Sequence, residues 1–191
     1  MVVARPDSSP FARVGRRELG YDTGQVDRFL ARVRGQYTAQ GPDGDLTSRD
    51  IRTVAFAPAR GGYEPRAVDA ALDRFEDGFA QRERDALIAA QGEDAWLRQI
   101  GRTAAVLRRR LRRPAGERFR RPTKAKSASY AVEDVDRLCD ELLRYLEHDL
   151  PLSVDVVRRA VFREARGADG YEENQVDAFL DRVVELMAAI D

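Results

Sequence analysis

The sequence predicts an all-α protein built from repeated modules, each a turn followed by an amphipathic helix, which form a helical bundle, a coiled coil or both. Two observations predict this. Apolar residues recur along the 191-residue chain at helical rather than alternating spacing. Hydrophobic residues make up 43% and charged residues 35% of the chain, which is enough for a thin core. We therefore expect helices and no strand.

A short motif, Tyr followed five residues later by Val-Asp, occurs four times. For a chain with six Tyr, chance would place such a pair only about 0.2 times, so an internal repeat is the better explanation. Gly precedes three of the tyrosines, and Leu stands nine residues after three of them. The third copy has Ser129 and Cys139 at these places. The motif residues are Gly20, Tyr21, Val26, Asp27, Leu30, Gly62, Tyr63, Val68, Asp69, Leu72, Tyr130, Val135, Asp136, Gly170, Tyr171, Val176, Asp177 and Leu180.

Each motif carries the pattern of a helix start. Pro65 lies two residues after Tyr63, and proline is favoured at the first helical position. By analogy, the residue after each motif Tyr is the N-cap, and the Tyr and Val form a hydrophobic staple. Asp22 and Gln25 have the spacing of a capping box. We expect the preceding glycines to supply a positive φ for a sharp turn into the helix.

The modules come in two pairs. Successive motif tyrosines are 42, 67 and 41 residues apart, and segments 46–56 and 152–162 match in position and pattern. The second residue of each segment, Thr47 or Ser153, is of a type that often caps a helix N-terminus. Each segment therefore predicts a helix of two to three turns that ends near a Phe. Phe11 and Phe119 occupy the corresponding places before the first and third Tyr. The expected organisation is a first pair at 11–91, a basic helix and linker at 92–118, and a second pair at 119–191.

An apolar stripe runs from Phe75 to Leu107 and is a candidate surface for a partner or a second copy. One reading has a continuous helix there. The other ends it at Gly92 and starts a second at Glu93 and Asp94.

Positive charge is concentrated in one tract, although the formal net charge is zero. Between Arg108 and Lys126 there are ten basic residues and one acid, Glu117, so the tract is a candidate contact for a polyvalent anion. Pro114, Gly116 and Pro122 predict that its second part is a linker. The candidate anion or membrane contacts in this tract are Arg108, Arg109, Arg110, Arg112, Arg113, Arg118, Arg120 and Arg121. As an alternative function, the same tract would bind nucleic acid, with an affinity that falls steeply with salt.

The residues of common catalytic and cofactor sites are missing. The chain has one His, His148, and one Cys, Cys139, and no Gly-rich nucleotide motif, so we predict neither an enzyme nor a cofactor or metal site. The four motif Asp are expected to meet an Arg or to favour the helix dipole, and Cys139 to be a buried thiol. No apolar run approaches the roughly 18 residues of a membrane span, and the first residues lack a signal-peptide core, which predicts a cytoplasmic protein.

Residues 20–30 read Gly-Tyr-Asp-x3-Val-Asp-x-Phe-Leu, and 170–180 match nearly as well; 62–72 differ by Ala71 in the Phe place. This string resembles the N-terminal domain of the DivIVA family of bacterial division and polar-growth proteins, and the fourfold use resembles the DivIVA-repeat proteins of high-GC Gram-positive bacteria. The resemblance implies a noncatalytic, self-associating scaffold or adaptor that recruits division or wall-growth proteins at septa and poles.

The resemblance also implies a membrane contact. In the family, an exposed apolar residue beside a basic one, in the turn before Gly-Tyr, inserts into the membrane. The matching place here holds Leu19, with Arg16 and Arg17 nearby. Such a contact would make the cytoplasmic protein peripheral at a septum or pole.

Overall fold

The structure is a computed structural model that describes residues 9–38, 46–148 and 150–190. Helical residues make up 64% of the described ones, in seven α-helices. The expectation of no strand was wrong, because five short strands form two small antiparallel sheets. The chain divides into two compact units, residues 1–86 and 87–191, and each is described here by itself. The prediction that the chain lacks a signal-peptide core concerns its first residues, and residues 1–8 lie outside the described ranges.

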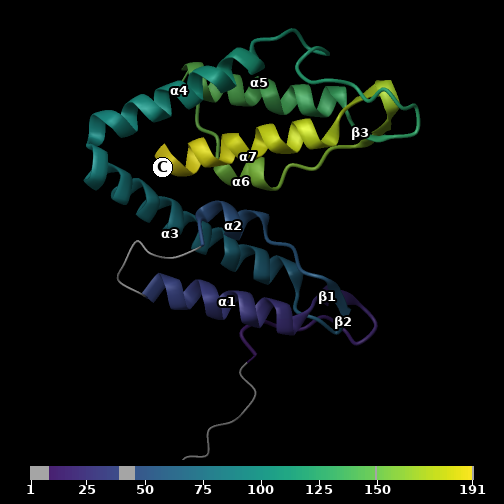
Figure 1. The fold of residues 1–191 in the computed structure, drawn as a ribbon. Coiled ribbons are helices and arrows are strands. Elements are labelled where there is room, and N and C mark those ends of the chain that lie inside the picture. Colours follow the sequence, from purple (N-terminus) through teal and green to yellow (C-terminus); the bar gives the residue numbers. More distant parts are fainter. Residues whose placement is uncertain (1–8, 39–45, 149, 191) are drawn as a thin grey trace, which may run out of the picture. The chain divides into compact units, whose positions relative to one another are not determined.

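The first unit has two long helices that start from one small sheet, and a short helix between them in sequence. Its elements are β1 (Leu19–Tyr21), α1 (Thr23–Thr38), α2 (Ser48–Thr53), β2 (Pro58–Arg60) and α3 (Pro65–Gln91), the last of which runs on into the residues of the second unit. Figure 1 shows both strands at the end of the unit where α1 and α3 begin. Apolar residues of the two helices, with Ile51 of α2, form the core. They are Val26, Leu30, Val33, Val68, Leu72 and Phe79.

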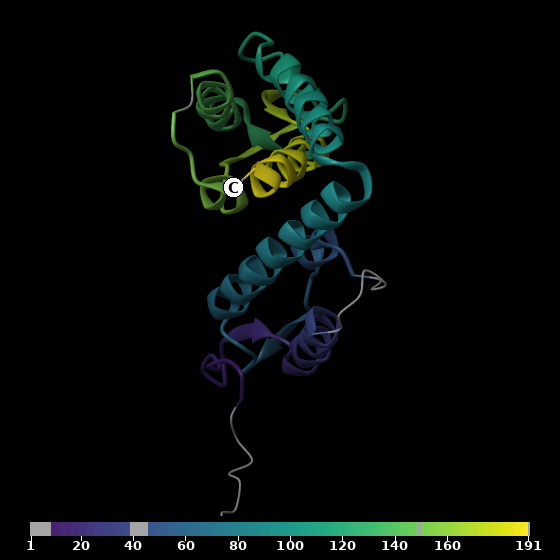
Figure 2. The same cartoon turned by 90° about the vertical axis from the view of Figure 1, so that its left-hand side faces the viewer.

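The second unit repeats this plan and adds a helix. Its elements are α4 (Glu93–Leu111), β3 (Ala128–Ala131), α5 (Val132–His148), α6 (Val154–Arg158), β4 (Glu164–Arg166), the 3-10 helix η1 (Gly167–Asp169), β5 (Gly170–Tyr171) and α7 (Glu173–Ile190). Strand β3 is central and pairs with both β4 and β5. Figure 2 shows α4, α5 and α7 surrounding one core.

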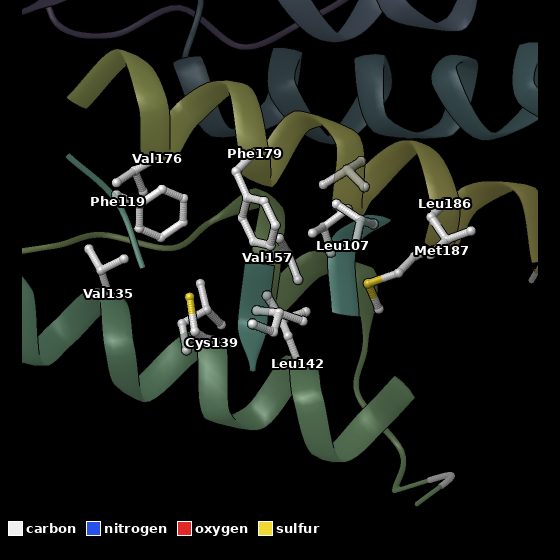
Figure 3. Close-up of a cluster of buried hydrophobic side chains, with 14 of the residues drawn as sticks. Leu107, Phe119, Val135, Cys139, Leu142, Val157, Val176, Phe179, Leu186 and Met187 are labelled. Atoms are coloured by element: carbon white, nitrogen blue, oxygen red, sulfur yellow. The ribbon is translucent and has the colours of Figure 1, made fainter. Parts of the chain in front are cut away.

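The core of the second unit lies between α5 and α7. Cys139 and Leu142 of α5 point toward Phe179 of α7 and toward Val157 of α6 (Figure 3). Leu107 and Leu111 of α4 are also buried in this core. Segment 92–111 is therefore a packed helix of the second unit.

All four predicted helix starts are confirmed. Helices α1, α3, α5 and α7 begin two residues after a motif Tyr, and Pro65 is the first residue of α3. The Asp22 carboxylate accepts from the backbone N–H of Gln25 at 2.8 Å, and the Glu64 carboxylate accepts from that of Ala67 at 2.7 Å. These carboxylates satisfy N–H groups that have no partner inside the helix.

Two other local predictions need correction, and one open alternative is decided. Helices α2 and α6 have only six and five residues, which is less than the expected two to three turns, and they end at Thr53 and Arg158, three and four residues before the Phe. The Asp22 and Gln25 pair is not a capping box, because the side-chain Oε1 of Gln25 accepts from Ala57 N at 2.9 Å instead of from the backbone N–H of Asp22. Of the two alternatives left open for the segment from Phe75 to Leu107, the structure has the break, because α3 ends at Gln91 and α4 starts at Glu93, with Gly92 between them at a φ of 84°.

Candidate functional site

In the first unit, the two motif loops cross. Tyr21 N donates to Tyr63 O at 2.9 Å, and Tyr63 N donates to Tyr21 O at 2.9 Å. In the second unit, the register of β3 and β5 pairs Tyr130 with Tyr171 in the same way. Each motif is therefore held through its Tyr backbone by the other motif of its unit.

The glycines permit this crossing, for a reason other than the predicted one. None of Gly20, Gly62 and Gly170 has a positive φ. A Cβ on Gly20 would lie 2.3 Å from Tyr63 O, and a Cβ on Gly62 would lie 2.3 Å from Tyr21 O. Glycine is required there because one backbone approaches the other too closely for any side chain.

The tyrosine side chains also cross to the other motif. The Tyr63 hydroxyl donates to the Asp27 carboxylate at 3.0 Å, and the Tyr171 hydroxyl donates to Asp136 at 3.1 Å. The remaining two pairs, Tyr21 with Asp69 and Tyr130 with Asp177, are also hydrogen-bonded. Each motif Asp carboxylate thus accepts a hydrogen bond from the Tyr hydroxyl of the other motif, which was not expected from the sequence. The predicted Arg partner is present at Asp136, where Arg118 Nη1 lies 3.4 Å from Oδ1.

The Phe that precedes each motif completes the exchange. Each Phe ring packs against the Tyr of the other motif, with centroid distances of 5.1 to 5.5 Å, in the pairs Phe11–Tyr63, Phe56–Tyr21, Phe119–Tyr171 and Phe162–Tyr130. The carbonyl after each Phe accepts from the N-cap N–H of the other motif at 2.9 Å, in the pairs Ala12–Glu64, Ala57–Asp22, Arg120–Glu172 and Arg163–Ala131. Both units therefore contain the same reciprocal exchange, which we call the motif crossing.

Burial raises the pKa of the tyrosine hydroxyl at three of the four motifs. Tyr171 has no exposed surface, and burial raises its pKa to about 12. Burial also raises the pKa of Tyr21 and Tyr130, and the Asp69 and Asp177 carboxylates add to it. At neutral pH these hydroxyls are donors to the motif carboxylates. The arrangement is a packed, hydrogen-bonded junction.

The basic tract is divided by the fold, and Arg118 is not a surface contact. Its side chain is 6% exposed and bonds to Asp136 and Asp140 and to the carbonyls of Leu111 and Arg113. Arg118 therefore fastens the linker to α5.

Among the other arginines of the tract, two bond to acidic or carbonyl oxygens of the second unit, and the rest differ in exposure. Arg112 pairs with Glu147 at 2.7 Å, and Arg121 donates to the carbonyls of Ala168 and Gly116. Arg109, Arg113 and Arg120 are exposed, while Arg108 and Arg110 are half-buried.

The predicted membrane contact is exposed. Leu19 stands in β1 with 63% of its surface accessible, and Arg16 and Arg17 are exposed in the preceding turn. The third motif has Ala128 in the place of Leu19.

Cys139 is the one thiol of the chain, and it is buried, as the sequence predicted. Burial raises its pKa to about 12, so the thiolate does not form at neutral pH. Within the described ranges, no three side chains of metal-binding type come together. No helix in the described part of the chain has the length and apolar run that a membrane crossing requires.

No family model, no curated protein and no solved structure matches this chain.

Proposed function

We propose that the chain is a noncatalytic adaptor of DivIVA type that acts in bacterial cell division or polar growth through protein–protein contacts. The single observation that carries the proposal is the motif crossing. Its residues are those of the string that resembles the DivIVA N-terminal domain, and they serve to hold two motifs together. The arrangement offers a scaffold rather than reactive groups.

The crossing supports a tandem arrangement. A reciprocal contact, in which residue i of one copy meets residue j of the other and the reverse, is the pattern of a two-fold dimer. Here both copies belong to one chain, and the two helices of each pair start at the crossing. Each unit then corresponds to a fused pair of modules, with two parallel helices of the kind that form coiled coils.

A membrane contact through Leu19 is part of the proposal. Its exposed side chain, next to Arg16 and Arg17, offers an apolar group and two charges to an anionic surface. Each Arg near such a surface adds about 1 kcal/mol, so these groups alone support only weak attachment. We therefore expect a cytoplasmic protein that is peripheral at the septum or pole and is retained there by protein partners.

A fluorescent fusion of the intact chain in its native host tests the proposal. The expected result is enrichment at septa or poles, reduced by Leu19→Ser and unchanged by the control Val161→Ser, whose side chain is also exposed. A diffuse distribution would contradict the proposal. A nucleoid pattern would contradict it and favour nucleic-acid binding by the basic tract.

A further inference from the structure

A pocket in the second unit brings together five arginines from three segments. It lies between α4 and α7 and has a volume of about 550 Å³. One carboxylate, Glu172, also lines it. The five arginines are Arg109, Arg110, Arg113, Arg120 and Arg182. The sequence tract did not include Arg182, which comes from α7, and it did include Arg118, which the structure buries elsewhere.

One of these arginines, Arg110, is held in place. Its Nη1 donates to Arg118 O at 2.9 Å, and its guanidinium lies 5.5 Å from the centre of the Phe119 ring. These contacts fix the Arg110 guanidinium in the pocket before any ligand arrives, which lowers the entropy lost on binding. Arg120 lies 3.5 Å from the Glu172 carboxylate, but its side chain is 75% exposed, so this pair holds it only weakly.

Among the described residues, the structure gives no ion pair for the remaining three arginines, Arg109, Arg113 and Arg182. The one carboxylate that lines the pocket, Glu172, pairs with Arg120. Burial lowers the pKa of Arg110, and the charges of Arg113, Arg109 and Arg120 lower it further. The positive charges of neighbouring arginines repel one another, and an anion bound between them would relieve that repulsion.

The pocket has an apolar side as well. Val106 and Leu107 of α4 face it together with Ala178 and Phe179 of α7. Its volume lies within the range of sites for small organic ligands, roughly 300–1,000 Å³. The amide side chain of Asn174 also lines it and is able to donate a hydrogen bond, while that of Gln175 accepts from Arg120.

We propose that this pocket binds a phosphate group carried on an organic molecule, with the phosphate on the arginines and the organic part against Phe179 and its apolar neighbours. Arginine suits this role because its planar guanidinium binds phosphate oxygens in pairs. The site does not depend on the adaptor role, since four of its five arginines lie outside the motif crossing of its unit, and Arg120 and Glu172 contribute only their backbones to that crossing. The phosphate could belong to a soluble small molecule or to a lipid headgroup, and the two sources are separable by experiment.

Titration calorimetry on the full chain at low salt tests the site, with ADP and inorganic pyrophosphate as soluble probes. Phosphatidylglycerol vesicles, compared with phosphatidylcholine vesicles in a flotation assay, are the lipid probe. The pocket variant is Arg113→Gln with Arg182→Gln. The matched control is Arg98→Gln with Arg102→Gln, because these residues are exposed on α4 and do not line the pocket. Both variants remove the same charge, and circular dichroism checks that both remain folded.

The expected result is that at least one probe binds, and that the pocket variant weakens its binding by roughly tenfold or more while the control changes it less than about twofold. Binding of ADP that is tighter than that of pyrophosphate would support the apolar wall and a soluble ligand. Binding of anionic vesicles alone would assign the phosphate to a lipid. The proposal is overturned if no probe binds, or if the pocket and control variants weaken binding equally. Septal or polar localisation is a separate readout, so failure here leaves the adaptor proposal standing.

Discussion

The two units share the motif crossing and differ in what surrounds it. In the first unit, Gly20 and Gly62 pack backbone to backbone, and Ser9 Oγ donates to the Tyr63 hydroxyl at 2.9 Å. In the second unit, Ser129 stands opposite Gly170, and the Tyr171 hydroxyl accepts from Arg118 N at 3.3 Å. Helix α4 and the buried Arg118 then add contacts that the described part of the first unit does not have. The comparison teaches that the crossing needs few fixed residues, and that a copy which departs from the motif is supported by added structure.

Removal of Arg118 should have the largest effect and should be confined to the second unit. Arg118→Met leaves Asp136, which is 6% exposed, without its cation and leaves the carbonyls of Leu111 and Arg113 without a donor. We expect a loss of about 3–5 kcal/mol, the usual cost of breaking a buried ion pair from one side. Hydrogen exchange measured by mass spectrometry should show it in 128–148 and 170–190.

Arg120→Met is the matched control for Arg118→Met. Arg120 is the next-but-one residue and has a side chain that is 75% exposed, so its loss should cost less than about 1 kcal/mol. Equal destabilisation by the two changes would mean that Arg118 does not hold the linker to α5.

Gly20→Ala should destabilise the first unit by about 3 kcal/mol, because the new Cβ would overlap Tyr63 O and force the two backbones apart. The control is Gly35→Ala in α1, where a Cβ meets nothing within 4 Å. That change should stabilise the unit by up to about 1 kcal/mol, since alanine is the better helix former. Chemical denaturation, monitored by hydrogen exchange of residues 19–38, measures the stability change of both variants. If Gly20→Ala is neutral, the close crossing of the backbones is wrong.

Alkaline pH should weaken the second unit through Tyr171. Its pKa in the folded state, about 12, lies above the ordinary value of 10.0, so the folded state binds the phenol proton more tightly. The resulting stability is complete below pH 10 and is lost as the pH rises from 10 toward 12. We expect the loss to reach about 2 kcal/mol and to be reduced in Tyr171→Phe. Cys139 has a pKa raised to about 12 as well, so the comparison is best made in two chains that both carry Cys139→Ala.

The smallest effect is expected at Ser129. Its Oγ is buried and has no hydrogen-bond partner. Ser129→Ala should therefore leave stability unchanged or raise it by up to about 1 kcal/mol, because it removes an unsatisfied polar group and keeps the Cβ. Thermal melting of the full chain measures this. A loss of more than about 1 kcal/mol would indicate a partner for the hydroxyl.

The sequence was sufficient to predict what depends on local chemistry. The four helix starts followed from Pro65 and from the residue after each motif Tyr, because a helix N-terminus is determined by its own first turn. The buried Cys139 followed from its place in a helical stripe. The break at Gly92 was left open, since a glycine in a long polar helix is compatible with both outcomes.

What depends on two distant segments could not be predicted. Strands of two to four residues are too short to show alternation, so β1 to β5 were missed. Positive φ was the ordinary reason for a glycine before a helix, and only the crossing shows that Gly20 and Gly62 meet each other's backbone. Arg118 looked like one more charge of a linker, because nothing local indicates that Asp136 lies beside it. The available signal for reciprocal pairing was the equal spacing of Tyr and Asp in all four copies, each with a Phe upstream.

A double-mutant cycle tests the motif crossing most directly. Tyr63→Phe is combined with Asp27→Ala, which alters the other motif, and separately with Asp69→Ala, which alters its own motif. Because the Tyr63 hydroxyl donates to Asp27 at 3.0 Å, we predict a coupling free energy of about 1 kcal/mol with Asp27 and none with Asp69. Coupling of Tyr63 with Asp69 and none with Asp27 would show that each motif closes on itself, and would contradict the crossing on which the account depends.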